Sequence, residues 1–372
     1  MPALTTISLL AGMLVGTVIG YVLWECAYAF LPSMRNTNDH RIGELRMSAI
    51  SKEDYPNVTR LIDLYNFSYI MNQPSCTSNV DALILVPSKP ENQEKRKLIR
   101  QTWANFVELP LYKNNIPFRV IFLLGLSDTD VKQAELEREN FEYDDLVQGS
   151  FIDNYQNLTY KHVMALKWYL SYCSKSKILI KVDDNVFLNT PQLMIYLHNA
   201  MLHSELHQTT TTTPIAIRNT TEPSEFLLRG QRDLLFCNRK TGVRAHRNYR
   251  LKRRAKYSNY ASSTYPPHCP GYGIIYSPDV VQRLYDAAQQ AQFFGIDDIH
   301  ITGFLAEKLN INIIPAQAYT VTCVPGQPTC NELLDNSTNV NKPEFLFSFE
   351  PEAKQMLNMW HLHLERVRQH IL

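Results

Sequence analysis

Short apolar runs rich in β-branched residues alternate with amphipathic stretches over most of this chain, and this alternation constrains the fold more than any other feature. The runs are DALILVP (81–87), FRVIFLLG (118–125), KILIKVDDNVF (177–187), GYGIIYS (271–277) and INIIPAQAYTV (311–321). Helices are expected in KRKLIRQTWANF, in DTDVKQAELEREN, and around 157–172, 191–203 and 278–292. Strands read as near-continuous apolar runs when helices cover both faces of a parallel sheet. The sequence therefore predicts an α/β fold with a mainly parallel central sheet.

Composition narrows the function classes. The chain has 372 residues, and its 37 Lys and Arg nearly cancel its 36 Asp and Glu, which excludes an acidic disordered protein and a globally basic nucleic-acid binder. Two domains, or one large α/β domain with an appended anchor, fit this length. A basic cluster at 239–256 lies in a stretch, 203–263, that we interpret as a solvated insertion or long loop. No nucleic-acid partner is expected.

The N-terminus predicts a membrane anchor. Residues 7–24 contain no charge, and at 1.5 Å rise per residue they nearly span a hydrocarbon layer of about 30 Å. We expect a short tail at 1–6 and a single-pass signal anchor at 7–31, although a cleaved signal peptide is the alternative. The tail has no Lys or Arg, whereas three arginines follow the span between 35 and 46, and this distribution argues against a type II orientation.

Other features favour a lumenal body. Cys323 and Cys330 flank VPGQPT and could close a disulfide loop, with two buried free thiols as the alternative. The stretch at 32–78 is rich in Asn, Ser and Pro and reads as a stem, which leaves 79–372 as the body. Five Asn-x-Ser/Thr acceptor triplets support the secretory lumen, at Asn57, Asn66, Asn157, Asn219 and Asn336.

An acidic cluster follows the apolar strand expected at 178–181. Asp183, Asp184 and Asn185 come directly after it. Carboxylates at the end of a buried strand are costly to desolvate unless a positive group shares the site. Oxygen ligands suit Mg²⁺ or Mn²⁺, and these ions suit a diphosphate leaving group. A metal site and an ordinary strand-ending turn both remain open from this pattern.

A second acidic pair, Asp297 and Asp298, precedes an apolar helix expected at 299–309. A helix N-cap is the simplest interpretation, because a carboxylate there stabilises the first turn by about 1 kcal/mol. A carboxylate beside apolar residues could instead hold a raised pKa and act as a general base.

The chain carries an ordered set of motifs between about 83 and 309. They are Arg96 with Ile99-Arg100-Gln101-Thr102-Trp103; Phe122-Leu123-Leu124-Gly125; the run FIDNYQNLTYK (151–161); Trp168 and Cys173; KVDDNVF (181–187); YPPHCPGYG (265–273); and Asp297-Asp298-Ile299. Together these motifs resemble the inverting β-1,3-glycosyltransferases of glycosyltransferase family 31, which include β-1,3-galactosyl- and β-1,3-N-acetylglucosaminyltransferases.

The resemblance implies a GT-A fold, a type II Golgi membrane protein with its body in the lumen, a UDP-sugar donor and Mn²⁺. Asp183, Asp184 and Asn185 stand where the family has its Asp-Asp-Asp nucleotide and metal motif, so Asp184 and Asn185 are the implied metal ligands. Asp298 stands at the acid of a Glu-Asp-Val motif and is the implied general base. Arg100 is a candidate contact of the donor diphosphate, although a structural ion pair is its favoured role.

Two departures weaken this transfer. Asn185 replaces the family's usual direct metal ligand, and an amide oxygen brings no charge. The family often has a histidine ligand just before a proline near the C-terminus, but FSFEP (347–351) has none. His361 and His363 lie beyond it and are interpreted as surface residues of a helix.

The leading hypothesis is a Golgi β-1,3-glycosyltransferase that moves galactose from UDP-galactose, or N-acetylglucosamine from UDP-N-acetylglucosamine, to a glycan acceptor on a glycoprotein or glycolipid. The rival is a membrane-tethered family member with weakened or lost catalysis that binds a glycan or a partner. A glycosidase that uses the acidic pairs is a remote third. The leading hypothesis requires that Asp298 and the Asp183 turn converge in space.

Overall fold

The computed structural model describes residues 60–62, 67–78, 80–105, 118–194, 196, 232–245, 262–323 and 345–371. All of them belong to one compact unit, Val58–Leu372. The predicted tail and anchor at 1–31 lie outside the described residues. None of the described helices is both long enough and apolar enough to cross a membrane.

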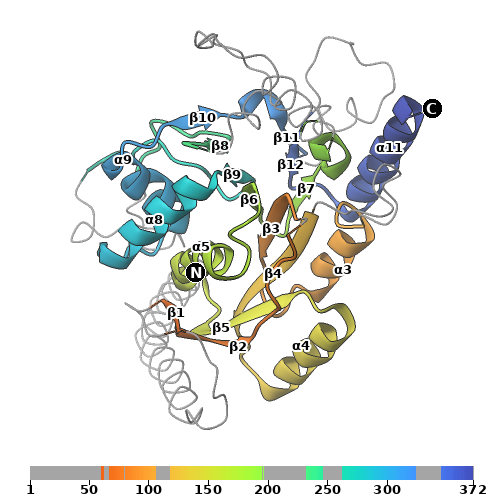
Figure 1. Ribbon diagram of the computed structural model, residues 1–372, viewed down its shortest axis with the longest axis horizontal. Helices are drawn as coiled ribbons and strands as arrows, with labels where there is room; N and C mark the ends of the chain where they lie inside the picture. Colours follow the sequence, from red (N-terminus) through yellow and green to blue (C-terminus); the bar gives the residue numbers. More distant parts are fainter. Residues whose placement is uncertain are drawn as a thin grey trace, which may run out of the picture. The chain divides into compact units, whose positions relative to one another are not determined.

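A nine-stranded sheet forms the centre of this unit (Figure 1). In spatial order its strands are β1 (Arg60–Ile62), β2 (Phe67–Met71), β5 (Leu146–Ile152), β4 (Phe118–Leu126), β3 (Ala82–Pro87), β6 (Ile178–Lys181), β9 (Ile274–Tyr276), β8 (Leu235–Cys237) and β10 (Ile313–Pro315). A second, three-stranded sheet has the order β11 (Thr320–Thr322), β12 (Phe347–Phe349) and β7 (Val186–Leu188).

The large sheet is mixed, so the expectation of a mainly parallel sheet is only partly correct. Strands β5, β4, β3 and β6 run parallel to one another. Strand β9 is antiparallel to both β6 and β8, and β2 is antiparallel to β5. The apolar runs were correctly located, but an apolar run carries no information about the direction of its neighbour.

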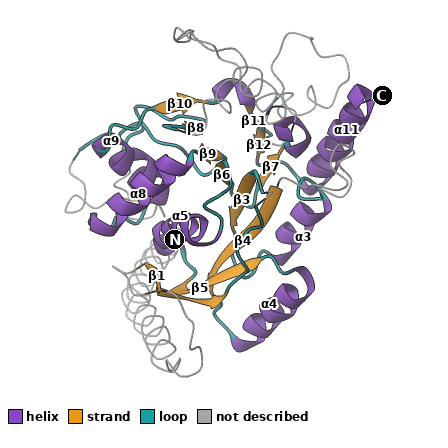
Figure 2. Cartoon of the chain, viewed as in Figure 1, coloured by secondary structure: helices purple, strands orange, loops and turns teal. Residues whose placement is uncertain are grey.

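Helices cover both faces of the sheet (Figure 2). They are α3 (Gln93–Gln101), α4 (Asp130–Tyr143), α5 (Leu158–Tyr172), α8 (Pro278–Gln290), α9 (Ala306–Lys308) and α11 (Ala353–Ile371), with shorter or π-helical turns at η3 (Tyr155–Asn157), η4 (Asp298–Leu305) and η5 (Gln317–Tyr319). These helices confirm the stretches expected at 157–172 and 278–292.

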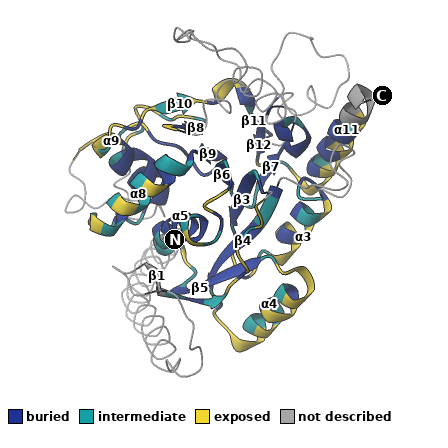
Figure 3. Cartoon of the chain, viewed as in Figure 1, coloured by how far each residue is buried: buried dark blue, intermediate teal, exposed yellow. Residues whose placement is uncertain are grey.

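Strand β3 shows why both faces are covered. Its alternate side chains enter two different cores, Ala82, Ile84 and Val86 on one side and Leu83 and Leu85 on the other. The first core also contains residues of α3, α4 and α11, and the second contains residues of α5 and α8. Successive residues of a strand point to opposite faces, so a strand that is apolar throughout must be buried on both. The buried centre and exposed outer helix surfaces are visible in Figure 3.

Two predicted strands prove to be two strands each. The run at 177–187 divides into β6 and β7 around the acidic turn, and the run at 311–321 divides into β10 and β11 around η5. In both cases the second strand joins the smaller sheet. The predicted insertion at 203–263 also contains β8, which is fully part of the large sheet. Strand β5 was not predicted, because the polar Gln148 interrupts its apolar pattern; Gln148 is buried and donates to the carbonyl of Gly125 at 2.9 Å.

The predicted stem boundary at 78 is wrong. Strand β2 pairs with β5, with Tyr69 opposite Gly149, and so belongs to the body. A disulfide from Cys76 to Cys173 ties the following segment to the end of α5. Strand β2 reads FSYIM, and a run of five residues with one polar position is too short to distinguish an edge strand from a linker.

Five cysteines within the described residues are disulfide-bonded. A second disulfide joins Cys237 to Cys269. Cys323 is also disulfide-bonded, but the expected pairing with Cys330 stays a prediction because Cys330 lies outside the described residues.

Asn157 begins the one predicted glycosylation triplet that lies within the described residues. Its side-chain amide donates to the carbonyl of Ile152 at 2.8 Å, and Thr159 of the same triplet is buried. Both side chains thus contribute to the packing of the body, and glycosylation of this triplet stays a prediction.

Candidate functional site

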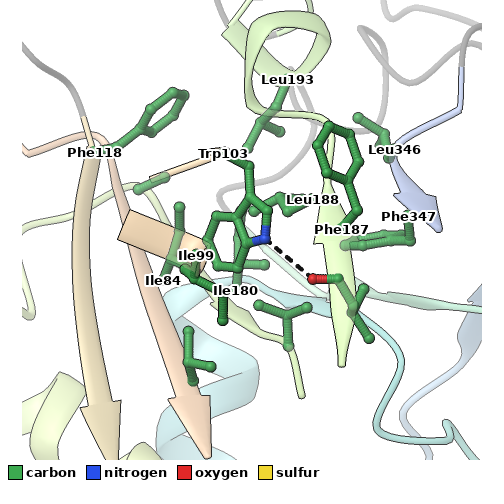
Figure 4. Packing of buried hydrophobic residues seen from close by; sticks show 14 of the residues in the cluster. Ile84, Ile99, Trp103, Phe118, Ile180, Phe187, Leu188, Leu193, Leu346 and Phe347 are labelled. Carbon is green, nitrogen blue, oxygen red and sulfur yellow. Dashed lines mark hydrogen bonds between the residues drawn. The ribbon is translucent and has the colours of Figure 1, made fainter. Parts of the chain in front are cut away.

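The acidic turn lies at the carboxyl end of β6, between β3 and β9, in the middle of the large sheet. Val186 continues from the turn into β7, and its carbonyl accepts a hydrogen bond from the indole Nε1 of Trp103 at 3.1 Å (Figure 4). Trp103 follows α3 and is completely buried. The hydrophobic core that contains Trp103 thus supports the acidic turn. The turn lies at the edge of the sheet where ligands bind in open α/β folds.

Gly271 joins the two acidic clusters. Its carbonyl accepts from the backbone N–H of Asp183 at 3.1 Å, and its own N–H donates to Oδ2 of Asp298 at 3.0 Å. A Cβ atom added to Gly271 would lie 2.2 Å from Oδ2 of Asp183, closer than any side chain could tolerate. The Asp183 turn and Asp298 therefore lie close together, as the leading hypothesis requires, because both are hydrogen-bonded to the backbone of Gly271.

Lys181 links the same groups through charge. Its ammonium lies 3.4 Å from Oδ1 of Asp183 and 3.7 Å from Oδ2 of Asp297. Burial by itself lowers the pKa of Lys181, but the carboxylates of Asp183, Asp297 and Asp298 raise it by more. Lys181 therefore stays an ammonium at neutral pH and keeps the neighbouring carboxylates compatible with burial.

Asp297 is held by a buried hydrogen-bond chain. Its Oδ2 lies 3.2 Å from Nδ1 of His162, and Nε2 of His162 lies 2.9 Å from the hydroxyl of Tyr276. Burial, reinforced by the charge of Lys181, lowers the pKa of His162 to about 4, so the imidazole is neutral. A carboxylate can only accept, so Nδ1 carries the proton and Tyr276 donates to Nε2.

Asp297 takes the N-cap position of the helix that follows, as the simplest interpretation expected. Its side chain, however, makes no capping hydrogen bond to the first turn of that helix. That helix, η4, is π-helical from Asp298 to Leu305, whereas the sequence predicted an ordinary helix over 299–309. Thr302 Oγ1 donates to the carbonyl of Asp298 at 2.6 Å and accepts from the N–H of Cys269 at 2.8 Å. Short π-helical segments are frequent at functional sites, and this one presents Asp298 to Gly271.

Asp184 faces a different set of partners. Its Oδ2 accepts from Ser88 Oγ at 2.8 Å and from Asn92 Nδ2 at 2.7 Å, and its Oδ1 accepts from Lys95 Nζ at 3.1 Å. A carboxylate has about four acceptor positions, and three of them are used here. Asp184 is thus hydrogen-bonded to the segment that connects β3 with α3.

Asn185 lies beside the C-terminal segment where the resemblance places a histidine. The N–H of Glu350 donates to the carbonyl of Asn185 at 3.1 Å. Glu350 follows β12 and has a left-handed backbone with φ of 59°, a conformation that costs energy in a residue with a side chain. The prediction for His363 is wrong: its side chain is buried, 5.1 Å from the ring of Phe345 between centroids, and within 3.4 Å of Asn189.

The predicted Mn²⁺ ligands do not fit a metal site well. Asp184 is occupied by three donors, one of them an ammonium, and Asn185 is uncharged. Among the described residues, the group with enough close ligand atoms to share an ion is His162, Asp297 and Asp298. Both ring nitrogens of His162 already have partners, and the Lys181 ammonium lies beside Asp297, so a hydrogen-bond network explains this group better.

Arg100 takes the structural role that the sequence favoured. Its guanidinium bonds Asp145 at 2.8 Å and Glu139 at 2.8 Å and lies over the ring of Tyr143. Arg96 is completely buried and pairs with Glu139 at 2.7 Å. These contacts join α3 to α4 and leave Arg100 no part in the acidic site.

Sequence reasoning missed the buried supports of the site. His162 lies on a helix whose other buried positions are mostly apolar, and Tyr276 looked like an ordinary strand residue. Lys181 and Gly271 were within the motifs that carried the resemblance but were given no role. A lysine at the end of an otherwise apolar strand was the one signal that could have pointed to a buried ion pair.

Comparison with known proteins agrees with the motifs. A sequence profile of the galactosyltransferase family matches residues 94–317, more than half of the chain. Lactosylceramide 1,3-N-acetyl-beta-D-glucosaminyltransferase B of Danio rerio is 31% identical over 67% of this chain and 59% of its own length. Beta-1,3-galactosyltransferase 1 of Homo sapiens is 27% identical over 79% and 82%, respectively. N-acetyllactosaminide beta-1,3-N-acetylglucosaminyltransferase 4 of Mus musculus is 26% identical over 67% and 62%. The chain thus spans about three fifths of the first and third of these relatives.

Proposed function

Because the chain belongs to the galactosyltransferase family, glycosyltransferase family 31, we propose that it transfers galactose or N-acetylglucosamine from a UDP-sugar to a hydroxyl of a glycan. The relatives are named for β-1,3 transfer of these two sugars, which supports a β-1,3 linkage here as well. The proposed acceptor is a glycan on a glycoprotein or glycolipid.

The contact of Asp183 and Asp298 through Gly271 carries this proposal. A transfer reaction needs a group that binds the donor and a base that activates the acceptor within a few ångströms of each other. Asp183 has a side chain that is 38% exposed, enough to meet a ligand. Asp298 is largely buried, with one carboxylate oxygen already oriented by the N–H of Gly271.

In the proposed reaction Asp298 takes the proton from the acceptor hydroxyl. The oxygen attacks the anomeric carbon of the donor in line, and the bond from that carbon to the UDP oxygen breaks, with its electron pair leaving on UDP. One displacement inverts the configuration at the anomeric carbon and gives a β linkage. A positioned general base contributes typically 10²- to 10⁴-fold to such a rate.

Lys181 and His162 act as positioning residues in this scheme. The Lys181 ammonium offsets part of the negative charge shared by Asp183 and Asp297. The chain from Tyr276 through His162 fixes Asp297 next to the proposed base. Rigid support of this kind keeps reacting groups at distances where small displacements reduce the rate.

The proposed location is the Golgi membrane, with a single-pass type II anchor at 7–31 and the body in the lumen. Two disulfides within the body support an oxidising compartment, because disulfides rarely persist in the cytosol.

The test is sugar transfer by the purified full-length protein in detergent, with UDP-galactose and UDP-N-acetylglucosamine offered separately to a panel of glycans. Replacement of Asp298 by Asn (Asp298→Asn) keeps the shape but removes the base, and should reduce kcat by 10²- to 10⁴-fold. The exposed Asp286 on α8 supplies a matched control, Asp286→Asn. Equal activity of Asp298→Asn and the native chain would remove Asp298 from the mechanism.

The contacts of Asp184 favour one second candidate, a family member that keeps the fold to bind a glycan or a partner without turnover. Asn185 offers a direct discrimination. If the native chain neither hydrolyses nor transfers either donor while Asn185→Asp does both, the native protein is the non-catalytic member. Turnover by the native chain establishes the transferase.

A further inference from the structure

We propose that the ammonium of Lys95 occupies the place of a divalent cation in this chain and binds the diphosphate of the nucleotide directly. The inference rests on the proposed function, since it names how the UDP part of the donor is held. It differs from the metal-dependent site that the family resemblance implies.

Lys95 lies at the same edge of the sheet as the acidic turn. Lys95 lies on the first turn of α3, which follows β3, and Asp184 follows β6; both strands end at the same edge of the sheet because they are parallel neighbours. Nζ of Lys95 lies 3.1 Å from Oδ1 of Asp184, and the Lys95 side chain is 48% exposed. An ammonium has three donors. One meets Asp184, and no other acceptor among the described residues bonds this ammonium, so that two remain for a ligand at this edge.

Asp184 is held so that one of its carboxylate oxygens faces Lys95. Ser88 and Asn92 both donate to Oδ2, so that this oxygen is held from the protein side and Oδ1 is directed to Lys95. Asp184 therefore positions a cation, as the acidic residue of a metal motif would, but the cation is a lysine. A divalent ion bound to Oδ1 would have to displace the ammonium or lie against it.

A second ammonium completes the charge balance. Lys181 lies on the other side of the turn, 3.4 Å from Asp183, and is buried. The turn thus meets one buried and one exposed lysine, and Asn185 is uncharged, so it does not call for further positive charge. The exposed lysine is the one that can reach a phosphate.

Binding of UDP to the full-length protein, measured by titration calorimetry, tests the inference without relying on turnover. We expect the Kd for UDP in EDTA to lie within about threefold of the Kd in Mn²⁺. Lys95→Ala should raise the Kd for UDP by about 10- to 100-fold, the range expected when a hydrogen bond to a charged group is lost. The Kd for uridine, which has no phosphate, should change less than twofold.

Lys97→Ala is the matched control, because Lys97 is an exposed lysine on the same helix. It should leave both dissociation constants unchanged. Lys95→Arg keeps the charge and should stay within about threefold of the native Kd for UDP. If Lys95→Ala lowers the Tm, Lys95→Arg still shows whether a positive charge at this position is sufficient for UDP binding.

Two results would overturn the inference. UDP binding that disappears in EDTA and returns with Mn²⁺ would place a metal at the turn and leave the proposed function intact; weaker Mn²⁺-dependent binding in Glu350→Gln would then identify Glu350 as one of its ligands. No UDP binding under either condition would remove the proposed function together with the inference.

Discussion

Replacing Gly271 by alanine should separate the two acidic groups of the site while leaving both of them in the protein. The three heavy atoms nearest to the added Cβ all belong to Asp183, at 2.2, 2.7 and 2.7 Å. Ordinary contact begins at 3.4 Å, so the Asp183 carboxylate must retreat by about 1.2 Å. Gly271 also donates its N–H to Asp298, and we expect this hydrogen bond to shift when residue 271 moves away from Asp183.

The displacement of Asp183 sets the size of the loss in reaction rate and of the loss in stability. A misplacement of about 1 Å in a reacting constellation costs about 10²-fold in rate, or about 2.7 kcal/mol of transition-state stabilisation. Overpacking of a well-packed core destabilises by about 1 to 3 kcal/mol, and the low end of this range applies here because the displaced Asp183 side chain is 38% exposed. Without the clash, a glycine to alanine change at a backbone without positive φ stabilises by about 0.4 to 1 kcal/mol, because the unfolded chain has less freedom to lose.

A double-mutant cycle distinguishes the clash from any general effect of the substitution. Gly271→Ala is measured in the native chain and in Asp183→Ala, by urea unfolding and by UDP-sugar transfer. In the native background the variant should be less stable; in Asp183→Ala the same change should be neutral or stabilising. The sign of the stability change thus depends on one carboxylate.

Equal destabilisation by Gly271→Ala in both backgrounds would refute the reasoning, since the cost would then come from something other than Asp183. Unchanged kcat/KM of Gly271→Ala in the native background would also contradict it, because the separation of donor and base groups would have no role in the reaction.

Two further perturbations probe the supports of the site. Arg96→Met leaves Glu139 buried with Arg100 as its remaining partner, and should lower the free energy of unfolding by about 3 kcal/mol in urea titrations, whereas Lys97→Met on the exposed side of α3 should change it little. Acid should destabilise the protein through His162, because its folded pKa of about 4 lies below the ordinary 6.5 and the unfolded chain binds the proton first. Stability is then full above pH 6.5 and falls by about 3 kcal/mol as the pH drops through 4; His162→Gln should flatten this part of the Tm profile, and an equally steep profile in that variant would assign the loss to other groups.

Much of the architecture was readable from local pattern. The runs that became β3, β4 and β6 are apolar at most of their positions, as strands covered by helices on both faces require. The carboxylates of Asp183 and Asp298 were conspicuous because acids beside buried strands and apolar helices need a reason. Local pattern does not show which distant residues will cover a segment. For this reason β2 looked like a linker and His363 looked like a surface residue: the residues that bury them lie far away in the sequence.

The sequence by itself determined the fold class, the family and the two acidic clusters, since periodicity and motif order are properties of neighbouring residues along the chain. Only the tertiary structure decided that Gly271 joins those clusters, that Asp184 faces Lys95, and that His162 supports Asp297. These contacts bridge 27 to 135 positions. Strand order and direction bring such residues together, and no repeat of two or 3.6 residues encodes which strand will be the neighbour of another.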